Sequence, residues 1–264
     1  MRHLSLLFLL LMSGIVSPAR AQTSFYAASV DSGDEIVLND GRILHLHGIA
    51  GPFAQNGEWP DKARKFLAEL TENRALEIEN ETTDRYGRIC AQVYALDTNG
   101  NKIWLQGEML RQGLAFVYPP TGDEARLDEM LAAEEAARRG EIAMWNDAAY
   151  ADTPADRAWP KKGHFAFIRG KVVDAARVKN MVYLNFGSNW RTDFTIAIAA
   201  HDLLEFRKAG FEPLDLKGAT IRTRGWVKRD FGPMIVVTDP KQIEILRVPD
   251  KQVTAGESEI AARR

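Results

Sequence analysis

Short runs in which apolar and polar residues alternate make up most of the chain, and this pattern limits the fold more than any other feature. Such alternation is typical of half-buried β-strands, and between residues 24 and 117 one helical stretch interrupts it, near Trp59 to Glu72. A second helical stripe runs from Glu124 to Arg139 and stops at Gly140, a frequent helix terminator. The pattern therefore predicts a mainly β fold with packed helices, of the α+β class.

A break in this pattern divides the chain into two parts. Residues 148–163 contain Pro154, Pro160 and the pair Lys161-Lys162, and they are typical of a linker. Beyond them we predict three strands, a helix and two strands, which is the element order of an OB barrel. These elements are Phe165 to Val173, Met181 to Phe186, Phe194 to Ala199, the helix His201 to Lys208, Thr220 to Lys228, and Met234 to Val237.

The first 21 residues have the form of a secretory leader. Arg2 and His3 precede an apolar run from Leu4 to Leu11, and Ala19-Arg20-Ala21 is a small-x-small cleavage site. A membrane anchor needs roughly 18 or more uninterrupted apolar residues, and Pro18 ends this run. We therefore expect export to the periplasm or the medium, with no membrane span in the mature protein. The predicted organisation is a leader at 1–21, a first domain at 22–150, a linker at 151–163, a second barrel at 164–249 and a polar tail at 250–264.

The net charge of −2 conceals two halves of opposite sign. Residues 22–160 carry 13 Lys and Arg against 24 Asp and Glu, a net charge of −11, whereas residues 161–264 carry 19 against 12, a net charge of +7. Nucleic-acid affinity depends largely on neutralising phosphates, so we expect a polyanion to prefer the C-terminal half. The alternative is an ordinary solvated surface.

A single cysteine, Cys90, excludes an intramolecular disulfide even though an exported protein could form one. Cys90 lies in the alternating run from Ile89 to Tyr94, and nothing near it in the sequence marks an activated thiolate. We therefore predict a buried structural thiol.

Four segments carry a family resemblance that extends from residue 23 to about 150. They are Val30 to Leu38 (VDSGDEIVL), Leu44 to Pro52 (LHLHGIAGP), Asp84 to Arg88 (DRYGR) and Gly107 to Tyr118 (GEMLRQGLAFVY), with Trp145 after the last helix. In this order and spacing they resemble the staphylococcal nuclease (thermonuclease) family. The resemblance implies an OB-type barrel with helices packed on it and a helix end at the fourth segment, so the whole chain is expected to contain two five-stranded OB-type barrels in tandem.

The resemblance also implies a site for phosphodiester cleavage. The family uses calcium held by two aspartates, a glutamate that activates water and two arginines on the phosphate. Asp34 matches the first aspartate and Arg88 the second arginine, whereas His45, Ala50 and Phe53 stand in place of the first arginine, the second aspartate and the glutamate. A lone aspartate is a poor calcium ligand set, and phenylalanine cannot accept a proton, so we expect calcium to bind weakly if at all and cleavage to be lost or slow.

Three routes would rescue activity. Glu58, in the same loop as Phe53, would be a substitute acid. His45 and His47, two apart on a predicted strand, would form a transition-metal site with Asp34. A shifted alignment is the third route, although Gly48 and Pro52 fix the register. Asp34 and Arg88 also have a structural interpretation: Asp34 would cap a turn, and Arg88 would belong to a segment that shapes a tight loop.

The C-terminal half interleaves basic and aromatic residues, a mixture that suits single-stranded nucleic acid but that a barrel interior also needs. Alternation from Ile221 to Val227 places Arg222, Arg224 and Trp226 on one face, and we predict this face to be exposed and to bind substrate. The other basic and aromatic residues are Arg169, Lys171, Tyr183, Phe186, Trp190, Arg191, Lys228, Arg229 and Phe231.

The sequence therefore favours an exported thermonuclease-family protein with an incomplete catalytic set and a basic C-terminal barrel for a polyanion. Two alternatives stay open. One is an active secreted nuclease that uses Asp34, Arg88 and His45 with a relocated acid or metal. The other is a periplasmic module that binds a protein partner.

Overall fold

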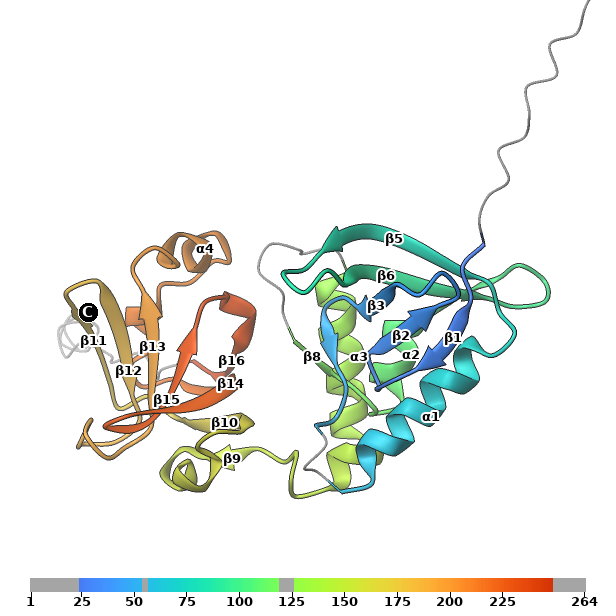
Figure 1. The fold of residues 1–264 in the computed structure, drawn as a ribbon. Coiled ribbons are helices and arrows are strands. Elements are labelled where there is room, and N and C mark those ends of the chain that lie inside the picture. The colour runs from blue at the N-terminus through green and yellow to red at the C-terminus, as the bar shows by residue number, and fades with distance from the viewer. Residues whose placement is uncertain (1–23, 54–56, 119–125, 249–264) are drawn as a thin grey trace, which may run out of the picture.

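The computed structural model describes residues 24–53, 57–118 and 126–248, which form two lobes (Figure 1). We call residues 24–150 the N-terminal lobe and residues 151–248 the C-terminal lobe. The predicted leader and the predicted tail at 250–264 lie outside the described residues. In the part that is described, no helix is long and apolar enough to cross a membrane.

The N-terminal lobe is built on a six-stranded sheet with the order β1-β2-β3-β6-β5, in which β7 also pairs with β6. Most pairs are antiparallel, but β3 and β6 run parallel. A separate two-stranded pair, β4 with β8, brings the loop after His47 against the chain that leaves the second helix. The strands are β1 Ala27–Val30, β2 Glu35–Leu38, β3 Ile43–Leu46, β4 Ile49–Ala50, β5 Leu76–Thr83, β6 Ile89–Leu96, β7 Lys102–Trp104 and β8 Phe116–Val117.

Three helices pack in this lobe: α1 Trp59–Thr71, α2 Leu105–Arg111 and α3 Leu127–Arg139. The first confirms the predicted stretch near Trp59, and α3 confirms the second stripe within the described residues. Helix α2, with seven residues, is too short for an apolar period to stand out, but the resemblance implied a helix end there. Cys90 is buried, as predicted, and burial raises the pKa of its thiol.

The C-terminal lobe is an eight-stranded sheet with the order β11-β12-β13-β15-β14-β10-β9, and β16 pairs with β14. Strands β13 and β15 are parallel. The predicted strands and helix are present, whereas β11 and β16 were missed. The elements are β9 Thr153–Pro154, β10 Phe165–Lys171, β11 Asp174–Val178, β12 Met181–Asn185, β13 Thr195–Ala199, α4 Leu203–Lys208, β14 Thr220–Asp230, β15 Gly232–Val237 and β16 Ile243–Arg247. The mainly β class with helices is therefore confirmed, and the tandem-barrel form of the prediction stays a prediction.

The segment predicted as a linker is folded onto the C-terminal lobe. Thr153 and Pro154 form β9 beside β10, and Ala158 is completely buried. Short 3-10 turns at Ala155–Arg157 and Trp159–Lys161 complete it. The prolines that suggested a loose linker instead lie at turn and sheet-edge positions, where a missing N–H does no harm.

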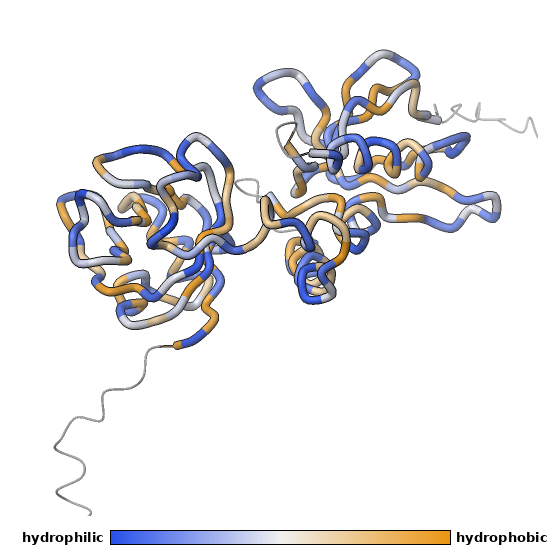
Figure 2. The backbone as a smooth tube through the Cα atoms, turned by 90° about the horizontal axis from the view of Figure 1, so that it is seen from below, coloured by the Kyte–Doolittle hydropathy of each residue, from blue (hydrophilic) through white to orange (hydrophobic). Residues whose placement is uncertain are grey.

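Each lobe has its own apolar core, and a third cluster joins them. Figure 2 shows apolar and polar residues alternating along the chain in both lobes. The third cluster contains Phe116, Met144, Trp145 and Tyr150 from the N-terminal lobe and Phe167 from the C-terminal lobe. The two lobes are therefore packed together through apolar surface.

Candidate functional site

Asp34 stands at the start of β2 beside the loop that follows β4. The Ser32 hydroxyl donates to its Oδ1 at 2.5 Å, and the His45 Nδ1 lies 3.9 Å from its Oδ2. The loop passes close by, because a Cβ on Gly51 would come within 3.1 Å of the Gly33 Cα and 3.3 Å of the Asp34 Oδ1. The structure thus brings His45 close to Asp34.

Arg88 is held by two carboxylates. Its guanidinium pairs with Asp84 in the loop before β6, at 2.7 Å from Nη2 to Oδ2, and its Nη1 pairs with Glu35 of β2. Burial alone would lower the pKa of Arg88, but these hydrogen bonds and charges outweigh it and raise that pKa. Sequence reasoning missed Glu35, which lies opposite His45 in the β2–β3 pairing. The sequence feature that could have indicated Glu35 is its position directly after Asp34, at the start of the strand that pairs with β3 and His45.

Ala50 and Phe53 pack against the apolar cluster between the lobes. The Phe53 ring centroid is 5.5 Å from that of Phe116, 5.8 Å from that of Phe165 and 5.3 Å from that of Trp226. The last two belong to the C-terminal lobe. The two positions where the resemblance places acids therefore carry apolar side chains that contribute to lobe docking.

The donor set around Asp34 does not fit the calcium ion that the resemblance implies. Calcium takes 6–8 oxygen ligands and favours several carboxylates, whereas the second acid position is Ala50, packed among aromatic rings. The described residues contain no group of three His, Cys, Asp or Glu placed to share an ion. Among the described residues the predicted transition-metal set of Asp34, His45 and His47 is therefore not assembled as a metal site.

Glu58, considered as a substitute acid, precedes α1 and points to a different partner. The Lys62 Nζ lies 2.6 Å from its Oε1, and the Glu58 side chain is 67% exposed. This pair, four residues apart at the helix start, has the usual spacing of a solvated helix ion pair. The geometry gives Glu58 no contact with Asp34.

The predicted exposed face of Arg222, Arg224 and Trp226 is exposed only at Trp226. Arg224 is 2% exposed and its Nη1 lies 2.8 Å from Oε2 of Glu134, which is equally buried on α3 of the other lobe. Arg222 is 11% exposed and pairs with Asp152 and Glu244 at 2.9 and 2.8 Å. The shared face was predicted correctly, but its exposure was wrong, because α3 covers it.

These residues belong to a network that we call the interlobe ion network. In this network Arg224 also lies 2.5 Å from the Glu244 Oε1 and donates a hydrogen bond to the Val117 carbonyl at 3.1 Å. On α3, the Arg138 guanidinium lies 2.9 Å from Glu134. Buried charges persist only when they are paired and hydrogen-bonded. Each charged group of this network has an oppositely charged partner, although among the described residues the Nε atoms of Arg138 and Arg224 have no hydrogen-bond acceptor. The opposite net charges of the two halves are thus used in part for contact between them. Its members are Arg138, Arg222, Arg224, Glu134, Glu135, Asp152 and Glu244.

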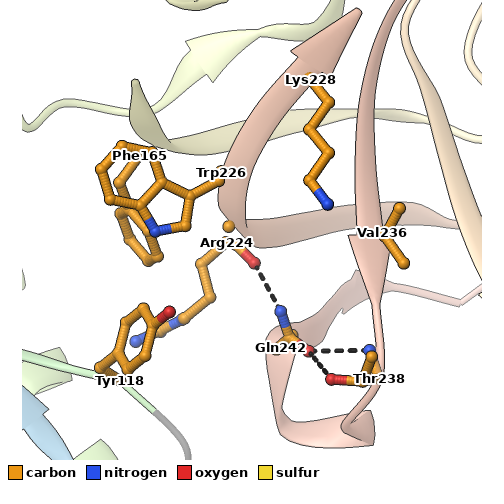
Figure 3. A pocket seen from close by; sticks show the side chains of 9 residues that line it. Tyr118, Phe165, Arg224, Trp226, Lys228, Val236, Thr238 and Gln242 are labelled. Carbon is orange, nitrogen blue, oxygen red and sulfur yellow. Dashed lines mark hydrogen bonds between the residues drawn. The ribbon is translucent and has the colours of Figure 1, made fainter. Parts of the chain in front are cut away.

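Trp226 is 44% exposed and borders a cavity of about 180 Å³ between the lobes. Figure 3 shows Trp226 beside Phe165, with Tyr118 facing them and Lys228 projecting from the same strand as Trp226. Trp226 also lines a second hollow, with Lys161 and His164. Exposed aromatic rings and cations therefore meet at this tryptophan.

Acid is expected to weaken the interlobe ion network. Burial alone would raise the pKa of Glu244, but Arg224 and Arg222 outweigh burial and hold it below its ordinary value of 4.5. A depressed carboxyl pKa stabilises the fold above the unfolded value and loses this contribution as pH falls through the folded value. The difference in unfolding free energy between the wild type and Glu244→Gln should therefore be largest above pH 4.5 and shrink below it, as urea titrations at several pH values can measure. A difference that grew with acidification would contradict this assignment.

Comparison with known proteins agrees with the motifs and the N-terminal fold. The family model described as "Staphylococcal nuclease homologue" matches residues 30–147. The chain is 32% identical over 122 residues to a Shigella flexneri protein named "Micrococcal nuclease", an alignment that covers 44% of this chain and 68% of that protein. It is 28% identical over 140 residues to "Protein ParB" of Escherichia coli, covering 50% of this chain and 78% of that protein. With its motifs, its sheet and these relatives in agreement, the chain belongs to the staphylococcal nuclease homologue family.

Proposed function

We propose that the nuclease domain of this family member serves as a scaffold and has weak or no phosphodiesterase activity. One observation carries the proposal. Phe53, at the position that the resemblance gives to the water-activating glutamate, packs on Phe165 and Trp226 of the C-terminal lobe. A phenylalanine in this contact cannot accept a proton, and it occupies the space that a proton-accepting side chain would need.

The expected loss of rate is large. A positioned general base contributes typically about 10²–10⁴-fold, and Phe53 supplies none. The second acid is replaced by Ala50, and Arg88 is already bound to two carboxylates, so a phosphate would have to compete for it. These changes act on different parts of the reaction, and together they favour a domain that has kept its fold and lost its chemistry.

For the C-terminal lobe we propose an OB-type barrel. Its sheet order begins with β11 and ends near β10, and these two strands are separated in the chain by residues 172 and 173 alone, so they can be read as one bent strand that closes the sheet. The parallel pairing of β13 with β15 supports the same interpretation. We also propose export, which rests on the sequence of the first 21 residues.

A nuclease assay tests the main proposal. The purified chain is incubated with single- and double-stranded DNA and with RNA, in calcium, manganese, zinc or chelator, and we expect fragments no faster than in the chelator sample. The Asp34→Ala variant is the matched control, and it should behave like the wild type. Metal-dependent cleavage by the wild type that Asp34→Ala abolishes would instead establish an active nuclease.

A second candidate function, binding of single-stranded nucleic acid or another polyanion, is favoured by the exposed Trp226 among cations. Bases stack on aromatic rings while Lys and Arg follow the phosphates, and Lys228 and Lys161 each line a hollow that Trp226 borders. Arg222 and Arg224, which the sequence suggested for this role, are bound to carboxylates. Their substrate-binding role stays a prediction, and the exposed lysines are the better candidates.

Binding of oligothymidylate to the whole chain tests this second function. Affinity is expected to fall steeply between about 50 and 200 mM salt, as for proteins that neutralise several phosphates. Lys228→Gln should weaken it, whereas Lys208→Gln, a lysine of the same lobe that pairs with Glu205 on α4, should not. Affinity that is independent of salt, or equal in both variants, would contradict the proposal.

A further inference from the structure

A separate cavity of about 440 Å³ lies on the side of the C-terminal lobe that carries β11, β12 and β13. Its size is within the range of small-molecule and cofactor pockets. Tyr183 and Asn185 of β12 line it together with Asp174 of β11, and the Thr195 hydroxyl of β13 lies 3.2 Å from the Asn185 Oδ1. This contact fixes the orientation of the Asn185 amide at the pocket.

Two aromatic rings from separate loops form one wall of this pocket. Trp190 is 49% exposed, Phe231 is 62% exposed, and their ring centroids are 5.4 Å apart in an edge-to-face arrangement. Large apolar side chains are seldom left this exposed next to each other unless they meet a ligand or partner. The pair therefore needs an explanation other than folding.

The backbone of Phe231 supplies an independent argument. Its φ is +57°, at the tip of the β14–β15 hairpin, where glycine or asparagine is the favoured residue. A bulky residue in the left-handed region is strained by of order 1–3 kcal/mol. The chain thus keeps an exposed phenylalanine in a position where glycine would fit with less strain, and such residues gather at functional sites.

The loop that carries Trp190 is well braced. The Asn189 backbone N–H donates to the Asp193 carboxylate at 2.8 Å, and the Trp159 indole N–H donates to the Thr192 carbonyl at 2.8 Å. Gly232 packs so closely on this loop that a Cβ there would lie 2.5 Å from the Asp193 carbonyl oxygen. The aromatic wall is therefore held in place before any ligand arrives, which lowers the entropy lost on binding.

The charge of the pocket limits its ligand. Among the described residues that line it, the charged side chains are Asp174 and Asp230, with no Lys or Arg. Phosphate groups would be repelled, so this pocket does not suit a nucleic acid. A cation would find part of this site already occupied, because Lys217 pairs with Asp174 at 2.7 Å and the Arg191 guanidinium lies 4.5 Å from the centroid of the Trp190 ring.

We propose that this pocket binds a neutral oligosaccharide. The apolar faces of sugar rings would stack on Trp190, Phe231 and Tyr183, and sugar hydroxyls would donate to the carboxylates of Asp174 and Asp230, which act as acceptors. OB-type barrels, the form proposed above for this lobe, carry oligosaccharides on the face of their second and third strands. The site is separate from the region around Asp34 and from Trp226, and the proposal is independent of the function proposed above.

Calorimetric titration of the full chain with chitotetraose and with cellohexaose tests the proposal. We expect saturable binding of at least one of them at or below about 1 mM. Phe231→Gly and Trp190→Ala should each weaken it about tenfold or more, since each removes a stacking ring. Leu204→Ala, which removes an equally exposed apolar side chain from α4 of the same lobe, should leave the affinity unchanged.

Thermal unfolding separates a binding defect from a folding defect. Phe231→Gly should melt no lower than the wild type, because glycine adopts a positive φ without strain. Failure of both sugars to bind would overturn the proposal, as would equal affinity in Phe231→Gly and the wild type. Binding of hexalysine or oligothymidylate that depends on Trp190, without sugar binding, would assign the pocket to a peptide or a nucleic acid instead.

Discussion

Arg224→Ala is expected to lower the free energy of unfolding by about 3–5 kcal/mol, the typical effect of removing one partner from a buried ion pair. The substitution leaves the Glu134 carboxylate, 2% exposed, without its partner from the C-terminal lobe. It also removes the hydrogen bond that the same guanidinium donates to the Val117 carbonyl. Urea unfolding monitored by tryptophan fluorescence measures the loss.

The control for this prediction is Arg139→Ala. Arg139 is 74% exposed and lies 3.6 Å from Glu135 on the surface of α3, and exposed pairs contribute at most about 1 kcal/mol. The double variant Arg224→Ala with Glu134→Ala should lose less than the sum of the single losses, because neighbours in one network are not additive. Equal small losses in Arg224→Ala and Arg139→Ala would show that the lobes are not docked through this network.

Restoring the family residues, as Ala50→Asp with Phe53→Glu, is expected not to restore nuclease activity. The side chain at position 53 faces Phe116, Phe165 and Trp226, so a glutamate there would lose aromatic contacts and be placed among apolar rings. We expect the double variant to cleave DNA no faster than the wild type in calcium, measured with a fluorogenic oligonucleotide.

The same variant should also be less stable. Truncating a fully buried phenylalanine to alanine lowers the free energy of unfolding by about 3–5 kcal/mol. For the partly buried Phe53 we expect a loss of about 2–3 kcal/mol in Phe53→Ala and a larger loss in Phe53→Glu. Phe53→Leu, which keeps apolar volume, is the matched control and should lose less. A double variant that is as stable as the wild type and cleaves DNA would mean that residue identity alone, rather than lobe docking, had silenced the site.

The sequence predicted the positions of the strands better than it predicted which elements pack on their faces. Alternation placed Arg222, Arg224 and Trp226 on one face, and the structure agrees, but period-2 alternation describes the two faces of a strand without saying what packs on either. The covering partner, Glu134, lies on a helix about 90 residues earlier, where it appears as one of two adjacent glutamates in a helical stripe. The opposite charges of the halves were the signal for this contact, and they were instead interpreted as a preference for polyanions.

The candidate site shows the same limit. The motifs located Asp34, His45 and Arg88, and the structure places His45 beside Asp34. They did not reveal that Glu35 pairs with Arg88, because this contact joins residues 53 positions apart in the chain. Nor could they show that Phe53 contacts the second lobe, because that contact joins segments more than 100 residues apart. Long-range packing was decisive at each point that the sequence left open.

Calorimetric titration with calcium tests most directly whether the region around Asp34 lacks a calcium site. Extracellular calcium modules bind with dissociation constants of about 10⁻⁴–10⁻³ M using several oxygen ligands, and a site with Asp34 as its one acid should be weaker. We predict no saturable heat up to about 1 mM calcium, and the same flat trace for Asp34→Ala. Saturable binding near or below 10⁻⁴ M that Asp34→Ala abolishes would contradict this account.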